Sequence, residues 1–258
     1  GRALHKGPNL AEALTSAALV RQMDLDWASA EVEFQAAVKA HPGYALARQR
    51  YGLFLAWMRR FEEGRVELTT AKTLDPHSPS VAASCAWLEY YGGDFPQSIR
   101  VAQEAVNRYP GFSSAEVVLA LSLVQADRAS EAAAVLGNAL YREEENVSVL
   151  SLLSFARARE GNEEDAENLL NRLQDWASTR YVSPYYLAVP LHGLGRKADT
   201  MRALEEAERE RSPQVAYLAS EPIFHPLRGQ PEFQALLDRL RLPREPANTM
   251  RGAREEVA

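Results

Sequence analysis

The sequence predicts an all-α fold in which pairs of helices stack into a right-handed superhelical solenoid. The first observation is a set of four prolines, Pro8, Pro42, Pro76 and Pro110, spaced 34 residues apart. A fixed period of this length is typical of solenoids built from helix pairs. Phasing on these prolines divides the chain into six consecutive blocks, which are 11–44, 45–78, 79–112, 113–146, 147–180 and 181–214.

The second observation is that small residues recur at fixed positions of the blocks. The eighth position holds Ala18, Gly52, Ala86, Ala120, Ser154 and Ala188, and the twentieth holds Ala30, Gly64, Ser98, Ala132, Ala166 and Thr200. The twenty-seventh position is alanine in every block except at Leu173 and is expected to be a close contact too. The twenty-fourth position holds the large apolar residues that are expected to fill the space between the two helices. These are Phe34, Leu68, Leu136, Leu170 and Leu204, with Ala102 as the exception. These positions predict that two helices of each block pack closely.

The third observation concerns the ends of the helices. Gly93, Gly161 and Gly195 share the fifteenth position, where glycine can adopt the left-handed conformation that ends a first helix. The prolines fall just past each predicted second helix, because proline lacks the N–H needed to continue it. Each block therefore predicts a first helix, a tight turn and a second helix.

This pattern resembles the tetratricopeptide repeat over nearly the whole chain. The departures are Glu144, Ser178 and Ser212, which stand where the terminating proline is expected. Residues 1–10 are expected to be the end of a truncated preceding repeat, because Ala3 occupies the twenty-seventh position before Pro8. The alternative is a frayed leader.

The C-terminal part has a different pattern. Pro231 can open a last helix. The apolar residues Phe233, Leu236, Leu237 and Leu240 then form one stripe along it. Residues 215–242 are therefore expected to cap the final repeat. Residues 243–258 lack a periodic apolar pattern and are expected to be a flexible tail.

Composition and motifs indicate a non-catalytic chain. The net charge of −6 argues against binding nucleic acid, which requires a basic surface. The longest uncharged apolar stretch, Val117 to Ala126, is too short to insert across a membrane. Cys85 is the single cysteine, and the five histidines are scattered without the spacing of a zinc site. We expect no cofactor, no metal and no catalytic set.

The resemblance also implies which face would bind a partner. In tetratricopeptide arrays, positions two, five, nine and twelve of each block line the concave side, and position thirteen borders it. The expected partner-binding residues are Gln49, Leu53, Trp57, Trp87, Tyr90, Tyr91, Val117, Leu121, Phe155, Arg159, Tyr185 and His192. Because Trp and Tyr are enriched at binding hot spots, this apolar and aromatic face predicts a protein or peptide partner. The alternative is that these rings pack against neighbouring repeats or that the groove closes on itself.

One kind of partner is not expected. Repeat proteins that grip a chaperone's C-terminal carboxylate use lysine and asparagine at the fifth and ninth positions. Here the fifth positions are Thr15, Gln49, Ala83, Val117, Ser151 and Tyr185, which form no such clamp.

A narrower resemblance lies in two segments. The first segment, at 23–47, is similar to a repeat of large bacterial signalling proteins and reads MDLDWASAEVEFQAAVKAHPGYALA. The second resembles the usual end of the same proteins and reads RYVSPYYLAVPLHGLGRKADTMRALEEAERERS, followed by YLASEPIFHPLRGQPEFQALLDRL. In those proteins the array follows a winged-helix domain of the CadC type or a serine/threonine kinase domain. The resemblance implies an interaction or sensory arm, cytoplasmic or extracytoplasmic. An oligomerisation scaffold with self-association, or a small-ligand sensor, are the alternatives.

Overall fold

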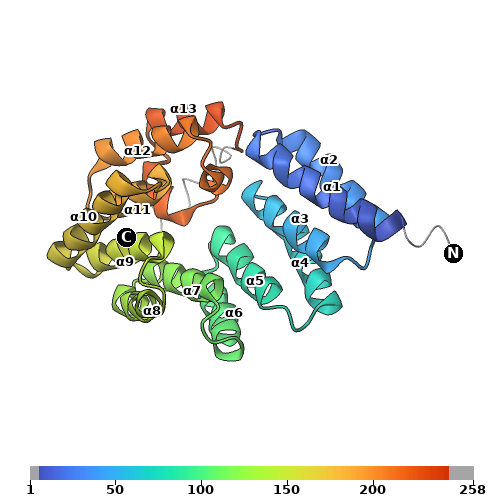
Figure 1. Cartoon of the computed structure of the whole chain (residues 1–258), viewed down its shortest axis with the longest axis horizontal. Coiled ribbons are helices and arrows are strands. Elements are labelled where there is room, and N and C mark those ends of the chain that lie inside the picture. The colour runs from blue at the N-terminus through green and yellow to red at the C-terminus, as the bar shows by residue number, and fades with distance from the viewer. Residues whose placement is uncertain (1–5, 244–258) are drawn as a thin grey trace, which may run out of the picture.

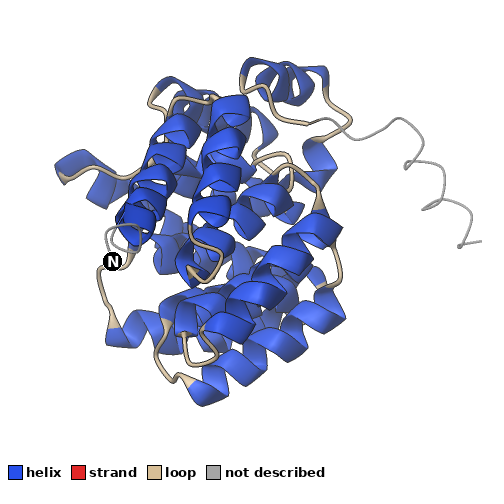
Figure 2. Ribbon diagram, turned by 90° about the vertical axis from the view of Figure 1, so that its right-hand side faces the viewer, coloured by secondary structure: helices blue, strands red, loops and turns tan. Residues whose placement is uncertain are grey.

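The computed structural model describes residues 6–243, which contain thirteen α-helices, two 3₁₀ helices and no strand (Figure 2). The first three pairs are α1 (Lys6–Met23) and α2 (Trp27–Ala40), α3 (Ala45–Trp57) and α4 (Phe61–Leu74), and α5 (Pro79–Gly92) and α6 (Phe95–Arg108). The next three are α7 (Ser113–Gln125) and α8 (Ala129–Arg142), α9 (Val147–Glu160) and α10 (Glu163–Thr179), and α11 (Pro184–Gly193) and α12 (Lys197–Arg209). They are followed by η1 (Pro213–Tyr217), η2 (Pro222–Leu227) and α13 (Pro231–Arg239).

The six pairs confirm the expected all-α solenoid. Pro42, Pro76 and Pro110 each lie two residues after the end of a second helix. Where Ser178 replaces the proline, α10 continues to Thr179 and reaches 17 residues. Where Glu144 and Ser212 replace it, α8 and α12 still end at Arg142 and Arg209.

The small residues lie where the two helices of a pair touch. The eighth and twentieth positions are buried in all six pairs. A Cβ on Gly64 would lie 2.8 Å from the Gly52 carbonyl oxygen, so no larger residue fits between α3 and α4 without a backbone shift. In the fifth pair the same approach is a hydrogen bond, in which Ser154 Oγ donates to the Ala166 carbonyl at 2.7 Å.

The turn between the two helices of a pair uses a left-handed residue in every block. The glycines at the fifteenth position have φ values of 83° at Gly93, 89° at Gly161 and 72° at Gly195. The other three blocks place Leu25, Arg59 and Asp127 there, with φ of 58°, 62° and 57°. L-residues rarely adopt this conformation, so packing of the pair holds the backbone where local preference does not favour it.

The two ends of the chain differ from expectation or lie outside the described residues. Pro8 lies in the first turn of α1, where its missing donor costs no helical hydrogen bond, so it does not terminate a helix as expected. The rest of the expected preceding repeat, residues 1–5, lies outside the described part. So does the expected tail, apart from Pro243.

The array curves until its two ends meet (Figure 1). Trp27 Nε1 at the start of α2 donates to the Leu240 carbonyl after α13 at 2.8 Å. Arg211 Nη1 lies 3.6 Å from Asp24 Oδ1 across the same seam. Between these contacts, the segment containing η1 and η2 turns into the inside of the arc. The first and last repeats are therefore joined through the C-terminal segment.

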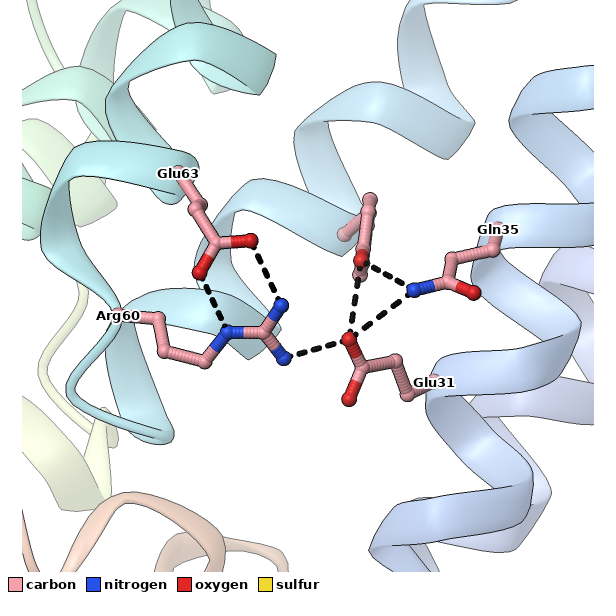
Figure 3. Close-up of polar contacts among 5 residues, drawn as sticks. Glu31, Gln35, Arg60 and Glu63 are labelled. Carbon is pink, nitrogen blue, oxygen red and sulfur yellow. Dashed lines mark hydrogen bonds and ion pairs between the residues drawn. The ribbon is translucent and has the colours of Figure 1, made fainter.

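A polar network joins the first two pairs (Figure 3). Arg60, just before α4, binds Glu63 through two N–H groups at 2.7 Å each and also pairs with Glu31 of α2. Glu31 in turn accepts from the Tyr51 hydroxyl at 3.2 Å and from Gln35 Nε2 at 3.1 Å. These charge-assisted bonds fix how the second pair stacks on the first. Within the described helices, none has the length and apolar character needed to cross a bilayer.

Candidate partner-binding groove

The expected partner-binding residues all lie on first helices of the pairs but are not equally accessible. They lie on the first helices of the second to sixth pairs, α3, α5, α7, α9 and α11. Six are buried: Gln49, Tyr90, Tyr91, Leu121, Phe155 and Tyr185. Five are half-buried, namely Leu53, Trp57, Trp87, Val117 and His192, and Arg159 is exposed.

The C-terminal segment covers most of this face. The ring of Tyr217 in η1 lies 5.7 Å from that of Trp57 and 5.8 Å from those of Tyr91 and Tyr185, centroid to centroid. One side chain therefore contacts α3, α5 and α11 at once. The expected cap is only partly a cap: α13 packs beside α12, whereas residues 213–227 enter the concave face.

Hydrogen bonds fix this segment to the end of α3. Ser220 Oγ lies 3.1 Å from the carbonyl oxygens of both Ala56 and Trp57. These carbonyls belong to the last turn of α3, where the regular helical hydrogen bonds run out and other donors can bond to them. Arg59 Nη1 donates to the Ala219 carbonyl at 3.3 Å, and Arg228 Nη2 donates to the same oxygen at 2.6 Å.

Glu221 anchors the segment to α5. Its side chain is 1% exposed, and Oε1 accepts from the Tyr90 hydroxyl and from the Ile223 N–H. Burial raises the pKa of the Glu221 carboxyl to about 7, although the bonds from Tyr90 and Ile223 favour the charged form. Glu221 therefore changes its protonation near neutral pH, which is unusual for a carboxyl group.

His192 is part of the wall and not a free polar contact. Its ring lies 5.5 Å from that of Phe224, which is fully buried. Burial is the main reason that the pKa of His192 is lowered. The imidazole is therefore neutral at physiological pH and packs beneath η2.

Two hollows remain open beside the C-terminal segment and meet at Trp87. The first has a volume of about 330 Å³ and the second about 300 Å³. Trp87, Ser114 and Tyr217 line both, so we call the combined surface the Trp87 groove. The first hollow is completed by Gln49, Arg50, Leu53, Trp57, Ser80, Ser84, Tyr91 and Phe112. The second is completed by Ser113, Val117, Leu121, Ser148, Leu152, Tyr185, Tyr186, Glu221 and Ile223.

The Trp87 ring is held in place from two sides. Its Nε1 donates to Ser114 Oγ at 3.1 Å, and its ring stacks on Tyr91 at a centroid distance of 5.4 Å. Tyr90 lies edge-on at 5.6 Å. The ring therefore presents a fixed apolar surface between the two hollows, and little side-chain freedom is left to lose on binding.

Neutral polar groups stand among the apolar residues that line the rest of the groove. Gln49 Nε2 donates to Ser84 Oγ at 2.8 Å, which leaves the Gln49 carbonyl oxygen as an acceptor. On the far wall, Gln214 Nε2 donates to the Tyr186 hydroxyl at 3.0 Å. The side chains with formal charge are Arg50 in the first hollow and Glu221 in the second. This lining suits a mostly apolar segment whose backbone can bond to hydroxyl and amide groups.

Reasoning from the sequence missed Tyr217 and Glu221, which come from outside the repeats. The signal for them is the apolar run Val215–Leu218, too short for a helix and followed by two prolines. Such a run between turn-forming residues must be covered by some other part of the molecule.

No cluster with the composition of a metal site occurs among the described residues. Burial raises the pKa of the Cys85 thiol, which keeps it protonated and therefore a poor nucleophile.

No family model and no curated protein matches this sequence. Solved structures do match. One is PilW, a type IV pilus biogenesis factor, at 18% identity and a TM-score of 0.61 over 88% of this chain and 98% of that one. PilF of Pseudomonas aeruginosa matches at 16% identity and a TM-score of 0.57, over 90% of this chain and 99% of that one. A tetratricopeptide repeat protein of Parabacteroides merdae matches at 16% identity and a TM-score of 0.55, over 90% of this chain and 93% of that one. At these identities the likeness concerns the fold, and the fold of this chain is that of a tetratricopeptide-repeat solenoid.

Proposed function

We propose that this chain is a non-catalytic protein-interaction domain of a larger bacterial signalling or regulatory protein, and that it binds an extended segment of a partner in the Trp87 groove. The observation that carries the proposal is the half-buried, immobilised Trp87 between two open hollows on the concave face. Concave faces of this fold are where helical repeats present binding surfaces.

The energetics of the groove support a peptide segment. Trp and Tyr side chains supply large contact areas at a low entropic cost, which is why they dominate binding hot spots. The serine hydroxyls and the Gln49 amide around Trp87 can bond to the backbone of an extended segment. Arg50, in the first hollow, favours an acidic group of the partner there.

The C-terminal segment limits the site. Because Tyr217 and Glu221 occupy the centre of the concave face, Tyr90, Tyr91 and Tyr185 serve mainly as support for the groove. The contacting residues in this proposal are therefore Trp87, with the half-buried Leu53 and Val117 on either side.

The experiment is a selection of peptides from a displayed random library against the purified chain, followed by calorimetry with the selected peptides. Trp87→Ala should weaken their binding by about 2 kcal/mol, roughly 30-fold, while circular dichroism stays unchanged. Tyr141→Ala is the matched control, because Tyr141 is 84% exposed on α8, a second helix of a pair. If Trp87→Ala and Tyr141→Ala bind equally, the groove is not the site.

The same variants test the scaffold alternative. Self-association through the groove would appear in light scattering as a mass that rises with concentration in the wild type and not in Trp87→Ala. A constant monomer mass together with peptide binding would support the interaction role.

A further inference from the structure

A second cavity lies at the seam where the two ends of the solenoid meet. It has a volume of about 200 Å³ and is bounded by the end of α1, the α1–α2 turn, the end of α3 and residues 211–216. Its walls are mostly apolar and include Leu19, Leu25 and Val215. Among the residues that line it, only Trp57 is shared with the Trp87 groove. We call this space the seam cavity.

One residue that lines the seam cavity has an unused hydrogen-bond donor. Gln22 lines it and is 6% exposed, and its side-chain Nε2 has no hydrogen-bond partner among the described residues. A buried amide donor left unpaired destabilises the folded state, so an acceptor placed there would recover that free energy. An acceptor oxygen on an otherwise apolar molecule would meet this need.

The charge at the cavity is positive. Arg211 is the charged residue among those that line it. Its pairing with Asp24 spans 3.6 Å between two largely exposed side chains, so solvent screens it and an anion can compete for the guanidinium. No carboxylate belongs to the lining.

We propose that the seam cavity binds a small apolar carboxylic acid, with a carboxylate oxygen accepting from Gln22 Nε2 and the negative charge facing Arg211. The size follows from the volume. An apolar cavity of about 150 Å³ holds benzene, so about 200 Å³ suits an apolar body of roughly six to eight carbon atoms. This inference goes beyond the proposed function, because it concerns a different cavity and a different class of ligand.

Binding there would stabilise the closed form of the solenoid. The walls come from the first helix pair on one side and from the C-terminal segment on the other. A ligand that contacts both can bind only when they are together, so it stabilises their association by mass action. Because the same C-terminal segment carries Tyr217 into the Trp87 groove, an acid bound at the seam would also hold one wall of that groove in place.

The test uses hexanoate and 3-phenylpropanoate as probes, with hexan-1-ol and hexylamine as controls that share the apolar body. Titration followed by NMR should give saturable binding of the acids, with the largest amide shifts near Leu25 and Val215 and smaller ones at Ser114. Both acids should raise the melting temperature, whereas hexylamine should not. The alcohol should bind about tenfold more weakly than the acid, because it lacks the charge that faces Arg211.

Three variants locate the site. Gln22→Leu should weaken the acids about tenfold by removing the donor, and Arg211→Gln should weaken the acids while leaving the alcohol unchanged. Ala216→Leu should abolish binding of both by filling the cavity, since Ala216 lines it and is 7% exposed. If Ala216→Leu does not fold, the other two variants still decide. Absence of saturable acid binding, equal binding of hexylamine, or acid binding unchanged in Gln22→Leu and Arg211→Gln would each overturn the proposal.

Discussion

Glu221→Gln should change how the stability of the protein depends on pH. Glutamine has nearly the same shape, and its carbonyl oxygen can still accept from the Tyr90 hydroxyl and the Ile223 N–H. It cannot ionise. The substitution therefore removes the buried charge while it keeps the anchor between the C-terminal segment and α5.

The magnitude follows from the pKa of Glu221, which rises from 4.5 to about 7 on folding. A carboxyl with a raised pKa binds its proton more tightly in the folded state. Its contribution to stability is therefore complete below pH 4.5 and is lost as the pH rises through 7. At about 1.4 kcal/mol per pKa unit, the wild type should lose roughly 2–3 kcal/mol relative to Glu221→Gln between about pH 5 and about pH 8.

The other titratable groups around Glu221 do not produce the same signal. Burial raises the pKa of Tyr90, Tyr91, Tyr185 and Tyr217 well above 10, so they stay protonated in this range, and the Arg228 guanidinium stays charged. His192 acts in the opposite direction: its lowered pKa means that stability increases as the pH rises towards 6.5. Both proteins contain all of these groups, so the difference between them isolates Glu221.

The assay is urea unfolding of both proteins, followed by far-UV circular dichroism at a series of pH values. Glu12→Gln is the control, because Glu12 is exposed on α1. A pH-dependent difference as large for Glu12→Gln as for Glu221→Gln would mean that the effect does not come from Glu221. A flat difference curve for Glu221→Gln, or one in which the wild type gains stability as the pH rises, would refute the reasoning.

Three further substitutions test the packing. Gly64→Ala should lower the melting temperature and cost about 1–3 kcal/mol, because the added Cβ would lie 2.8 Å from a carbonyl oxygen of α3. This clash outweighs the better helix propensity of alanine. An unchanged melting temperature would contradict the prediction. Ala139→Phe should overpack the contact within the fourth pair and cost about 1–3 kcal/mol or more in urea unfolding, whereas Ala13→Phe, on the exposed face of α1, should be nearly neutral. Trp27→Phe should remove the bond to the Leu240 carbonyl, cost about 1 kcal/mol and increase amide exchange in α13; protection equal to the wild type would mean that this bond does not hold the seam.

The repeat architecture follows from the sequence because each repeat contacts mainly its neighbours. The same small residues recur every 34 positions, and each set meets the same partner within its own pair. The eighth and twentieth positions of a block, which are 12 residues apart, touch in the same way in different pairs. Examples are the contact of Gly52 with Gly64 and that of Ser154 with Ala166. Local contacts of this kind leave a period that can be read without the structure.

The left-handed turns were predictable only in part. Glycine at the fifteenth position indicates the turn in three blocks. Leu25 and Arg59 adopt it in two other blocks against their local preference, and Asp127, whose residue type tolerates it better, adopts it in the third. Only their place in the repeat identifies them, since packing of the two helices of a pair supplies the free energy that the local conformation lacks.

The accessible part of the concave face was decided by tertiary structure alone. Tyr90 and Glu221 are 131 residues apart in the sequence, and nothing in the repeat pattern predicts that they touch. A periodic pattern shows which side chains point inward, but it contains no information on how far the array curves or where a non-repetitive segment goes. Because the array curves until α2 meets Leu240 just after α13, residues 213–227 are carried into the groove. There they bury Tyr90, Tyr91 and Tyr185 and leave Trp87 half-buried between the two hollows.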